Sequence, residues 1–181
     1  IIASTKRSVP FSGRMRPIVA MPDVLPRHPD TTALVIGRAA KSDEQFLNDL
    51  KAKIAKANLT DRVLFPGEIA STNLPEVMRA LSLVVQLPRY EGYGMTPLEG
   101  MASGVPFVAT DQGYYRQFSA QGQAGVISDM PAEDIHALLS DPCRLMQMSA
   151  SARDIANTHF SIAREASGIS QTYQALWSDE A

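Results

Sequence analysis

The sequence predicts an α/β fold in which a Rossmann-like parallel sheet carries helices on both faces. From Thr31 onward, short apolar runs typical of buried strands alternate with longer stretches of helical pattern. Strands that alternate with helices in this way form βαβ units, and the strands of such units are parallel. Ligands bind at the carboxyl ends of the strands in sheets of this kind. We therefore expect the functional residues in the loops that follow the strands.

Each predicted strand is a short apolar run that ends in a turn. The run 33–36 ends at Gly37, and Val84 and Val85 form the centre of another. Unbroken apolar runs of this length are typical of strands buried on both faces. The predicted strands cover residues 33–36, 62–65, 82–87, 105–109 and 125–127.

Helices are predicted from capping residues and from apolar side chains that recur every three or four positions. Ser42, with Gln45 three residues later, matches a capping box, and Leu50 and Ile54 continue one apolar face. Another helix is expected to begin at Pro97, because proline suits the first helical position. The remaining predicted helices cover residues 74–81, 132–140, 142–157 and 161–177.

Composition and charge exclude several classes of function. The net charge of −2 gives no general attraction to nucleic acid or to an anionic membrane. A single cysteine, Cys143, rules out an intrachain disulfide and a cysteine-rich zinc cluster, and the histidines lack metal-ligand spacing. No apolar run has the length that crosses a bilayer, and residues 1–20 lack the apolar core of a signal peptide. We expect a soluble, cytoplasmic protein without a metal site.

The strongest functional signal lies between Pro88 and Glu99, where a predicted strand is followed by a predicted helix. Gly92 and Gly94 let the backbone bend sharply and approach a ligand with no Cβ in the way. Glu91 lies at the start of this loop, and Glu99 lies in the first turn of the helix. A carboxylate accepts two hydrogen bonds, so Glu99 suits the two hydroxyls of a ribose and Glu91 suits a donor sugar or the charge near it.

The start of this helix is expected to form a diphosphate site. Thr96 is predicted to be the N-cap and Pro97 the first helical residue. The N–H groups of Met95, Thr96 and Leu98 would then face the loop, where the helix dipole favours an anion. Thr96 and Glu99 also fit a capping box, which would be a purely structural role for Glu99. The combination of a strand end, two glycines and two carboxylates favours the ligand site.

This segment resembles the signature of the family 4 glycosyltransferases, retaining enzymes of the GT-B fold. The resemblance rests on two glutamates, the turn between them and the residues that follow the second glutamate: Glu91, Gly92, Tyr93, Gly94, Glu99 and residues 99–113. It extends over residues 11–178. Within it, residues 25–29 and 98–103 are similar to the branch of mannosyltransferases that build the lipopolysaccharide core.

The resemblance implies a role for each matching residue. In this family the second glutamate, here Glu99, binds the ribose, and the first, here Glu91, lies beside the donor sugar. The backbone at Gly67 and Ile69 lies near the base. The loop contacts the sugar and the diphosphate, so the remaining donor-binding candidates are Gly92, Tyr93, Gly94, Met95 and Thr96.

The resemblance also implies a cationic partner for the diphosphate, Arg14. A guanidinium spreads positive charge over two phosphates and stabilises the leaving group without a metal. Arg14 and Glu91 are therefore the candidate catalytic residues, although a solvated linker charge is the simplest interpretation of Arg14 alone. The sequence departs from the family at two places. No Lys-Gly pair follows Arg14, and Gln117 stands where a glutamate is usual.

The implied organisation is that of one half of a two-domain enzyme. Residues 1–10 are expected to be a remnant of the N-terminal domain or a linker, in which residues 1–5 form the end of a strand. Residues 11–178 are expected to form the nucleotide-sugar-binding domain, the C-terminal domain of a GT-B enzyme. Residues 161–181 are expected to form a C-terminal helix that crosses to the N-terminal domain. A fragment of this kind should bind donor but transfer poorly.

The implied function is transfer of a hexose, expected to be mannose from GDP-mannose, to a glycan or lipid-linked saccharide acceptor in lipopolysaccharide core or related glycan synthesis. The other expected partner is the chain's own N-terminal domain, through which the enzyme would associate with the inner face of the plasma membrane. No cofactor, metal or nucleic acid is expected. Two alternatives remain open: a non-catalytic nucleotide-sugar-binding module, and an epimerase or phosphorylase of the same fold.

Overall fold

The computed structural model describes residues 1–5, 16–38 and 44–178. In these residues, six parallel strands form one sheet in the order β3-β2-β1-β4-β5-β6. The strands are β1 (Ile2–Thr5), β2 (Ala33–Ile36), β3 (Val63–Gly67), β4 (Leu83–Gln86), β5 (Phe107–Ala109) and β6 (Gly125–Ile127). The strand order reverses between β1 and β4, which is where doubly wound sheets bind their ligands. The predicted fold class is confirmed.

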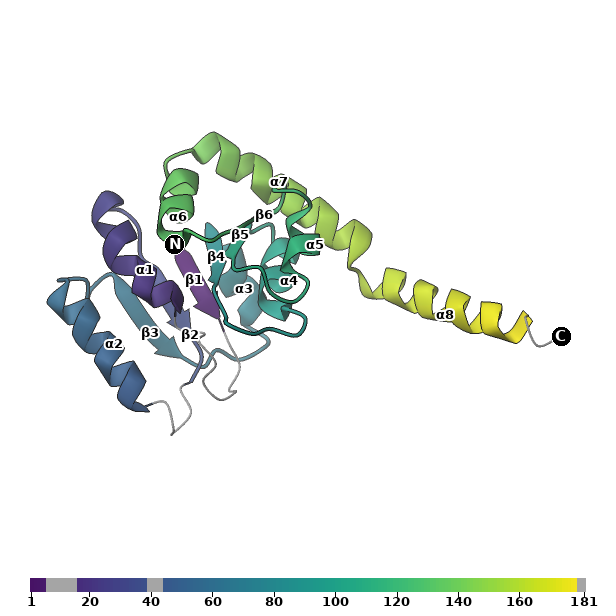
Figure 1. Ribbon diagram of the computed structural model, residues 1–181, viewed down its shortest axis with the longest axis horizontal. Coiled ribbons are helices and arrows are strands. Elements are labelled where there is room, and N and C mark those ends of the chain that lie inside the picture. Colours follow the sequence, from purple (N-terminus) through teal and green to yellow (C-terminus); the bar gives the residue numbers. More distant parts are fainter. Residues whose placement is uncertain (6–15, 39–43, 179–181) are drawn as a thin grey trace.

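Helices cover both faces of the sheet (Figure 1). One hydrophobic core lies beneath α1 (Arg16–Val24), α2 (Glu44–Lys56) and α6 (Pro131–Leu139). The second core lies beneath the helices of the opposite face, α3 (Leu74–Arg79), α4 (Met95–Ala102), α5 (Tyr115–Ser119) and α7 (Pro142–His159). Successive side chains of a strand point to opposite faces, so Val84 and Val85 enter different cores. This two-sided burial explains why β4 is apolar throughout its centre.

Strand β1 lies in the middle of the sheet, which corrects the expected domain boundary. It pairs in parallel with β2 on one side and with β4 on the other. Ile2 and Ala3 are each 1% exposed. The prediction that residues 1–10 are a linker or a remnant of another domain is therefore wrong for residues 1–5. A strand belongs to a sheet because it pairs with other strands, and the composition of a short apolar run does not show which strands those are.

Helix α1 is a second feature that the sequence pattern did not predict. Pro22 lies inside it, and the prolines around it indicate a loop rather than a helix. The helix is stabilised by burial, since Met21 is 2% exposed and Val24 is fully buried in the core. Tertiary packing here outweighs local helix propensity.

Helix α8 (Ile162–Ser178) extends away from the rest of the described chain (Figure 1). Its residues 162–177 are all exposed, including Ile162 at 85% and Trp177 at 80%. A helix over 161–177 was predicted, and its presence is confirmed. That it crosses to another domain stays a prediction. Among the described residues, no helix combines the length and apolar character needed to span a bilayer.

Candidate functional site

A cavity of about 580 Å³ opens at the carboxyl edge of the sheet. Its wall is formed by the end of β2, the connection from β3 to α3, and the connection from β4 into α4. The lining residues are Ile36, Gly37, Glu68, Ile69, Ser71, Leu74, Glu91, Tyr93, Gly94, Met95, Thr96 and Glu99. Because the strands are parallel, their carboxyl ends bring these distant segments to one place.

The two glutamates predicted to bind sugars line this cavity together. Both Glu91 and Glu99 are half-buried. The backbone N–H of Gly92 donates to Glu91 Oε1 at 3.1 Å, which holds this carboxylate at the start of the loop. Glu68, from the connection between β3 and α3, lines the same cavity. The cavity therefore combines several carboxylate acceptors with the start of a helix.

Helix α4 begins earlier than predicted. Its first residue is Met95 and its N-cap is Gly94, at φ 104° and ψ 57°. The prediction of Thr96 as N-cap is therefore wrong, and so is the capping box, because Glu99 lies too far into the helix. Pro97 occupies the third position, where its missing N–H costs no helical hydrogen bond.

Because α4 begins at Met95, the N–H groups at its start are not the set that was predicted to bind an anion. Met95 and Thr96 are the first two residues of the helix, so their N–H groups lie at its N-terminal end. The N–H of Leu98 falls where the first intrahelical hydrogen bond forms, so its predicted role as a loop-facing donor is wrong. The first turn of α4 contains no acidic side chain, which leaves the positive end of its dipole available to an anion.

Gly94 and Gly113 allow the close contacts that shape this loop. A Cβ at Gly94 would lie 2.0 Å from Cε1 of Tyr115, which is 1% exposed. Gly113, at φ 53°, approaches the loop so closely that a Cβ would lie 2.9 Å from the carbonyl oxygen of Tyr93. The next N–H, that of Tyr114, donates to the same carbonyl at 3.1 Å. The connection from β5 to α5 thus supports the connection from β4 to α4.

Two candidate residues do not line the cavity, and a third lies outside the described residues. Gly92 and Gly67 lie next to lining residues but are not part of the lining. The carbonyl of Gly67 accepts a hydrogen bond of 2.8 Å from the N–H of Gly37, which does line it. Arg14 lies outside the described residues. Ile69 lies in the cavity wall, and its predicted place near the base stays a prediction.

The lining residues that sequence reasoning missed lie at the end of β2 and between β3 and α3. Ile36, Gly37, Ser71 and Leu74 line the cavity beside Ile69. Gly37 carried a usable signal, since it ends a predicted strand and therefore marks a carboxyl end. Ser71 and Leu74 gave no local signal, because only the pairing of β2 with β3 brings them to this edge.

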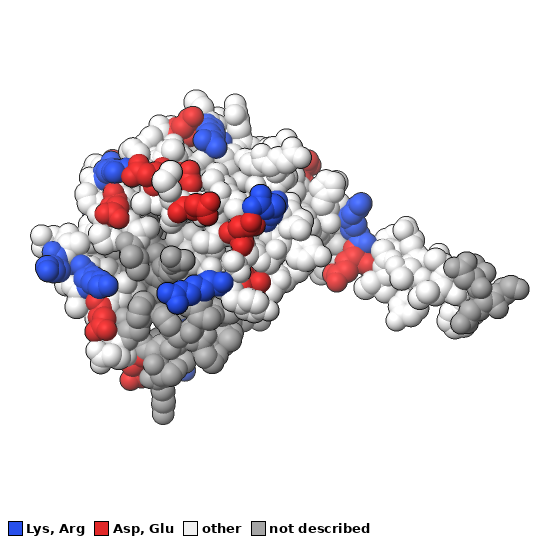
Figure 2. Space-filling model, in the orientation of Figure 1, with Lys and Arg blue, Asp and Glu red and all other residues white. Residues whose placement is uncertain are grey.

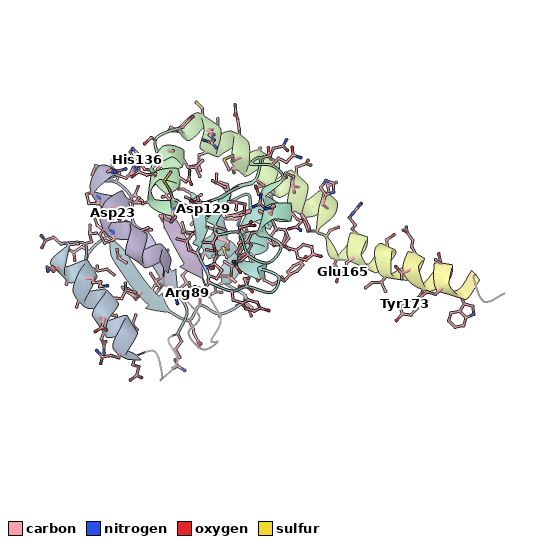
Figure 3. The ribbon with its side chains drawn as sticks, viewed as in Figure 1. Asp23, Arg89, Asp129, His136, Glu165 and Tyr173 are labelled. Atoms are coloured by element: carbon pink, nitrogen blue, oxygen red, sulfur yellow. The ribbon has the colours of Figure 1, made fainter. Side chains whose placement is uncertain are left out.

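A second cavity, of about 610 Å³, lies between α1, α6 and the ends of β4, β5 and β6. Acidic side chains gather on this face, among them Asp23 and Asp129 of the cavity wall (Figures 2 and 3). Glu133 and Asp134 occupy the first turn of α6 and so already neutralise its dipole. A diphosphate is therefore better accommodated at α4 than at α6. In the described part of the chain, no group of three or more His, Cys, Asp or Glu side chains is placed to hold a metal ion.

The fold and the first cavity define a class, the Rossmann-like domains with an open cavity at the carboxyl edge of a parallel sheet. The chain belongs to the glycosyl transferases group 1 family, whose model matches residues 1–155. The resemblance seen around Glu91 and Glu99 is thereby confirmed.

Individual relatives agree with this family. The lipopolysaccharide core biosynthesis mannosyltransferase LpsB of Rhizobium meliloti (strain 1021) is 41% identical over 160 residues, which are 84% of this chain and 45% of LpsB. The crystal structure of the C-terminal domain of a glycosyl transferase group 1 family protein (LpcC) from Francisella tularensis has a TM-score of 0.81 at 28% identity and covers 89% of this chain and 86% of that domain. Anabaena HepE in complex with UDP has a TM-score of 0.85 at 24% identity, over 96% of this chain and 48% of HepE. The chain thus spans about half the length of the full-length relatives.

Proposed function

We propose that this chain is the donor-binding domain of a retaining hexosyltransferase, and that its donor is a nucleotide-diphosphate sugar, GDP-mannose. The observation that carries the proposal is the single cavity that joins the start of α4 to Glu91 and Glu99. The similarity to a mannosyltransferase supports mannose as the hexose. The UDP bound to HepE supports a nucleoside diphosphate as the leaving group.

The proposed pose follows the cavity wall. The base lies against Ile69 and Leu74, two apolar lining residues from the connection after β3 and the start of α3. Glu99 accepts hydrogen bonds from the ribose hydroxyls. The diphosphate lies at the N–H groups of Met95 and Thr96, and the hexose lies beside Glu91. Each part of the donor thus meets a group of matching chemistry.

The proposed reaction replaces one bond at the anomeric carbon. The bond from this carbon to the diphosphate oxygen breaks, and a bond to an acceptor hydroxyl oxygen forms on the same face. The hydroxyl proton leaves with the departing diphosphate or to solvent. Negative charge grows on the diphosphate, so the start of α4 stabilises the transition state more than the ground state. Arg14, as the family resemblance implies, adds a cation to the same group, and no metal ion is needed for this step.

Calorimetric titration of the chain with GDP-mannose, UDP-glucose and GDP tests the proposal. GDP-mannose is expected to bind, and Glu99→Gln is expected to weaken binding about tenfold, since it replaces charged acceptors by a neutral amide. Glu165→Gln is the matched control, because Glu165 is exposed near the start of α8 (Figure 3) and is not among the residues that line the cavity. EDTA should leave the affinity unchanged. A folded chain that binds none of the nucleotides, or a Glu99→Gln variant with wild-type affinity, would contradict the proposal.

A further inference from the structure

Two exposed tyrosines lie side by side at the rim of the donor cavity. The ring centroids of Tyr93 and Tyr114 are 5.1 Å apart, with 39° between the ring planes. The two residues are 41% and 48% exposed. Both rings pack on the fully buried Phe118, at centroid distances of 5.4 Å from Tyr93 and 6.3 Å from Tyr114. The pair is therefore supported from the core while a large part of its aromatic surface faces solvent.

The backbone fixes the two rings relative to each other. The N–H of Tyr114 donates to the carbonyl of Tyr93, and Gly113 packs against the same stretch of backbone. The tyrosines come from different βα connections, yet these contacts hold both connections together. A fixed aromatic surface loses little conformational freedom when a ligand binds to it, which favours recognition.

The pair reaches from the cavity wall to residues outside the cavity lining. Tyr93 lines the cavity, whereas Tyr114 packs against Tyr93 and is not part of the cavity lining. The aromatic surface thus begins in the cavity wall that Tyr93 shares with Glu91 and continues beyond the lining at Tyr114. A second sugar ring that approaches the donor sugar from solvent would meet this surface.

Saccharides suit such a surface because a pyranose ring has an apolar face of C–H groups and an edge of hydroxyls. The C–H face packs on an aromatic ring, and a tyrosine offers both that ring and a hydroxyl for hydrogen bonding. Glu91 provides a carboxylate acceptor in the same cavity wall as Tyr93. Aromatic faces with a few polar groups are the usual composition of a small-ligand site.

We propose that Tyr93 and Tyr114 form a stacking platform for the pyranose ring of the acceptor saccharide. This inference rests on the proposed function, because it places the acceptor next to the hexose of the donor. The platform positions the acceptor and selects for a sugar with an unobstructed C–H face.

Ring-resolved NMR of the tyrosines tests the platform directly, because the chain has only 5 tyrosines. Methyl α-mannopyranoside and a mannobiose are titrated into the chain saturated with GDP, and sorbitol serves as a polyol control without a pyranose face. The ring signals of Tyr93 and Tyr114 are expected to shift. Tyr115, which is 1% exposed, and Tyr173, which is 64% exposed on α8 (Figure 3), are expected to stay unchanged. Absence of a shift at the pair, or equal shifts at Tyr173 or with sorbitol, would overturn the proposal.

A set of variants separates this inference from the donor-site proposal. Tyr114→Ala is expected to raise the dissociation constant of the saccharide about tenfold, and Tyr114→Phe is expected to retain most of the affinity because it keeps the ring. Tyr173→Ala should behave as wild type. GDP affinity, measured calorimetrically in the same samples, should change less than twofold in all three. Wild-type chain that fails to bind GDP refutes the donor site. If Tyr114→Ala binds GDP normally and its affinity for the saccharide is the same as that of the wild type, the platform is refuted but the donor site is not.

Discussion

Replacement of Gly94 by alanine tests whether the loop before α4 has the shape described here. The new Cβ would lie 2.0 Å from Cε1 of the buried Tyr115 ring, and φ is +104°. The left-handed backbone costs about 1–2 kcal/mol for a residue with a Cβ. Displacement of a packed ring costs about 1–3 kcal/mol more. We expect a loss of about 3 kcal/mol in the free energy of unfolding, or about 6–12 °C in Tm for a chain of this size.

Gly92→Ala is the matched control, two residues earlier in the same loop. No atom lies within 4 Å of a Cβ built at Gly92, and its φ is not positive. Its unfolding free energy should stay within about 0.5 kcal/mol of wild type. Urea unfolding of both variants, followed by circular dichroism, gives the comparison. If Gly94→Ala were as stable as Gly92→Ala, the described contact between Gly94 and Tyr115 would be refuted.

Three further outcomes are expected. His28 Nε2 and His136 Nδ1 lie 2.9 Å apart, and burial, followed by the charges of His136 and nearby arginines, lowers the pKa of His28 from its ordinary 6.5. As the pH falls, the imidazole of His28 is protonated in the unfolded chain before it is protonated in the folded chain, so the free energy of unfolding should be highest above pH 6.5 and should decrease below it. His28→Gln should make the free energy of unfolding less dependent on pH, as measured by unfolding titrations at several pH values. An unchanged pH dependence in this variant would contradict the prediction. Arg62 donates to the backbone carbonyls of His28 and Thr31, so Arg62→Met should lower the unfolding free energy by about 2–4 kcal/mol, and a loss below about 0.5 kcal/mol would show that these bonds contribute little. Trp177→Ala should change the stability of this chain by less than about 0.5 kcal/mol, because its side chain is 80% exposed; a clear drop in Tm would mean that α8 packs on the chain.

The candidate residues whose proximity the sequence predicted, and which line one cavity, are those whose signal is local. Glu91 and Glu99 flank a strand end and a helix start, so their neighbourhood follows from a short stretch of chain. The strands β2 to β6 also carry local signals, as unbroken apolar runs. The parallel topology then places their carboxyl ends together, which predicts the edge of the sheet where the cavity lies.

The features that the sequence could not predict depend on contacts between distant segments. β1 belongs to the sheet through its partners β2 and β4, not through its own composition. The start of α4 at Met95 depends on Gly94 fitting against Tyr115, which comes from the next βα unit. The pairing of Tyr93 with Tyr114 has the same origin, since each ring alone is an unremarkable loop tyrosine.

A crystal structure of the chain with GDP-mannose tests the central claim most directly. We predict that the diphosphate oxygens accept hydrogen bonds from the N–H groups of Met95 and Thr96, and that the ribose hydroxyls reach the carboxylate of Glu99. The account would be contradicted if the nucleotide sugar occupied the cavity beside Asp23 and Asp129 instead, or made no contact with the start of α4.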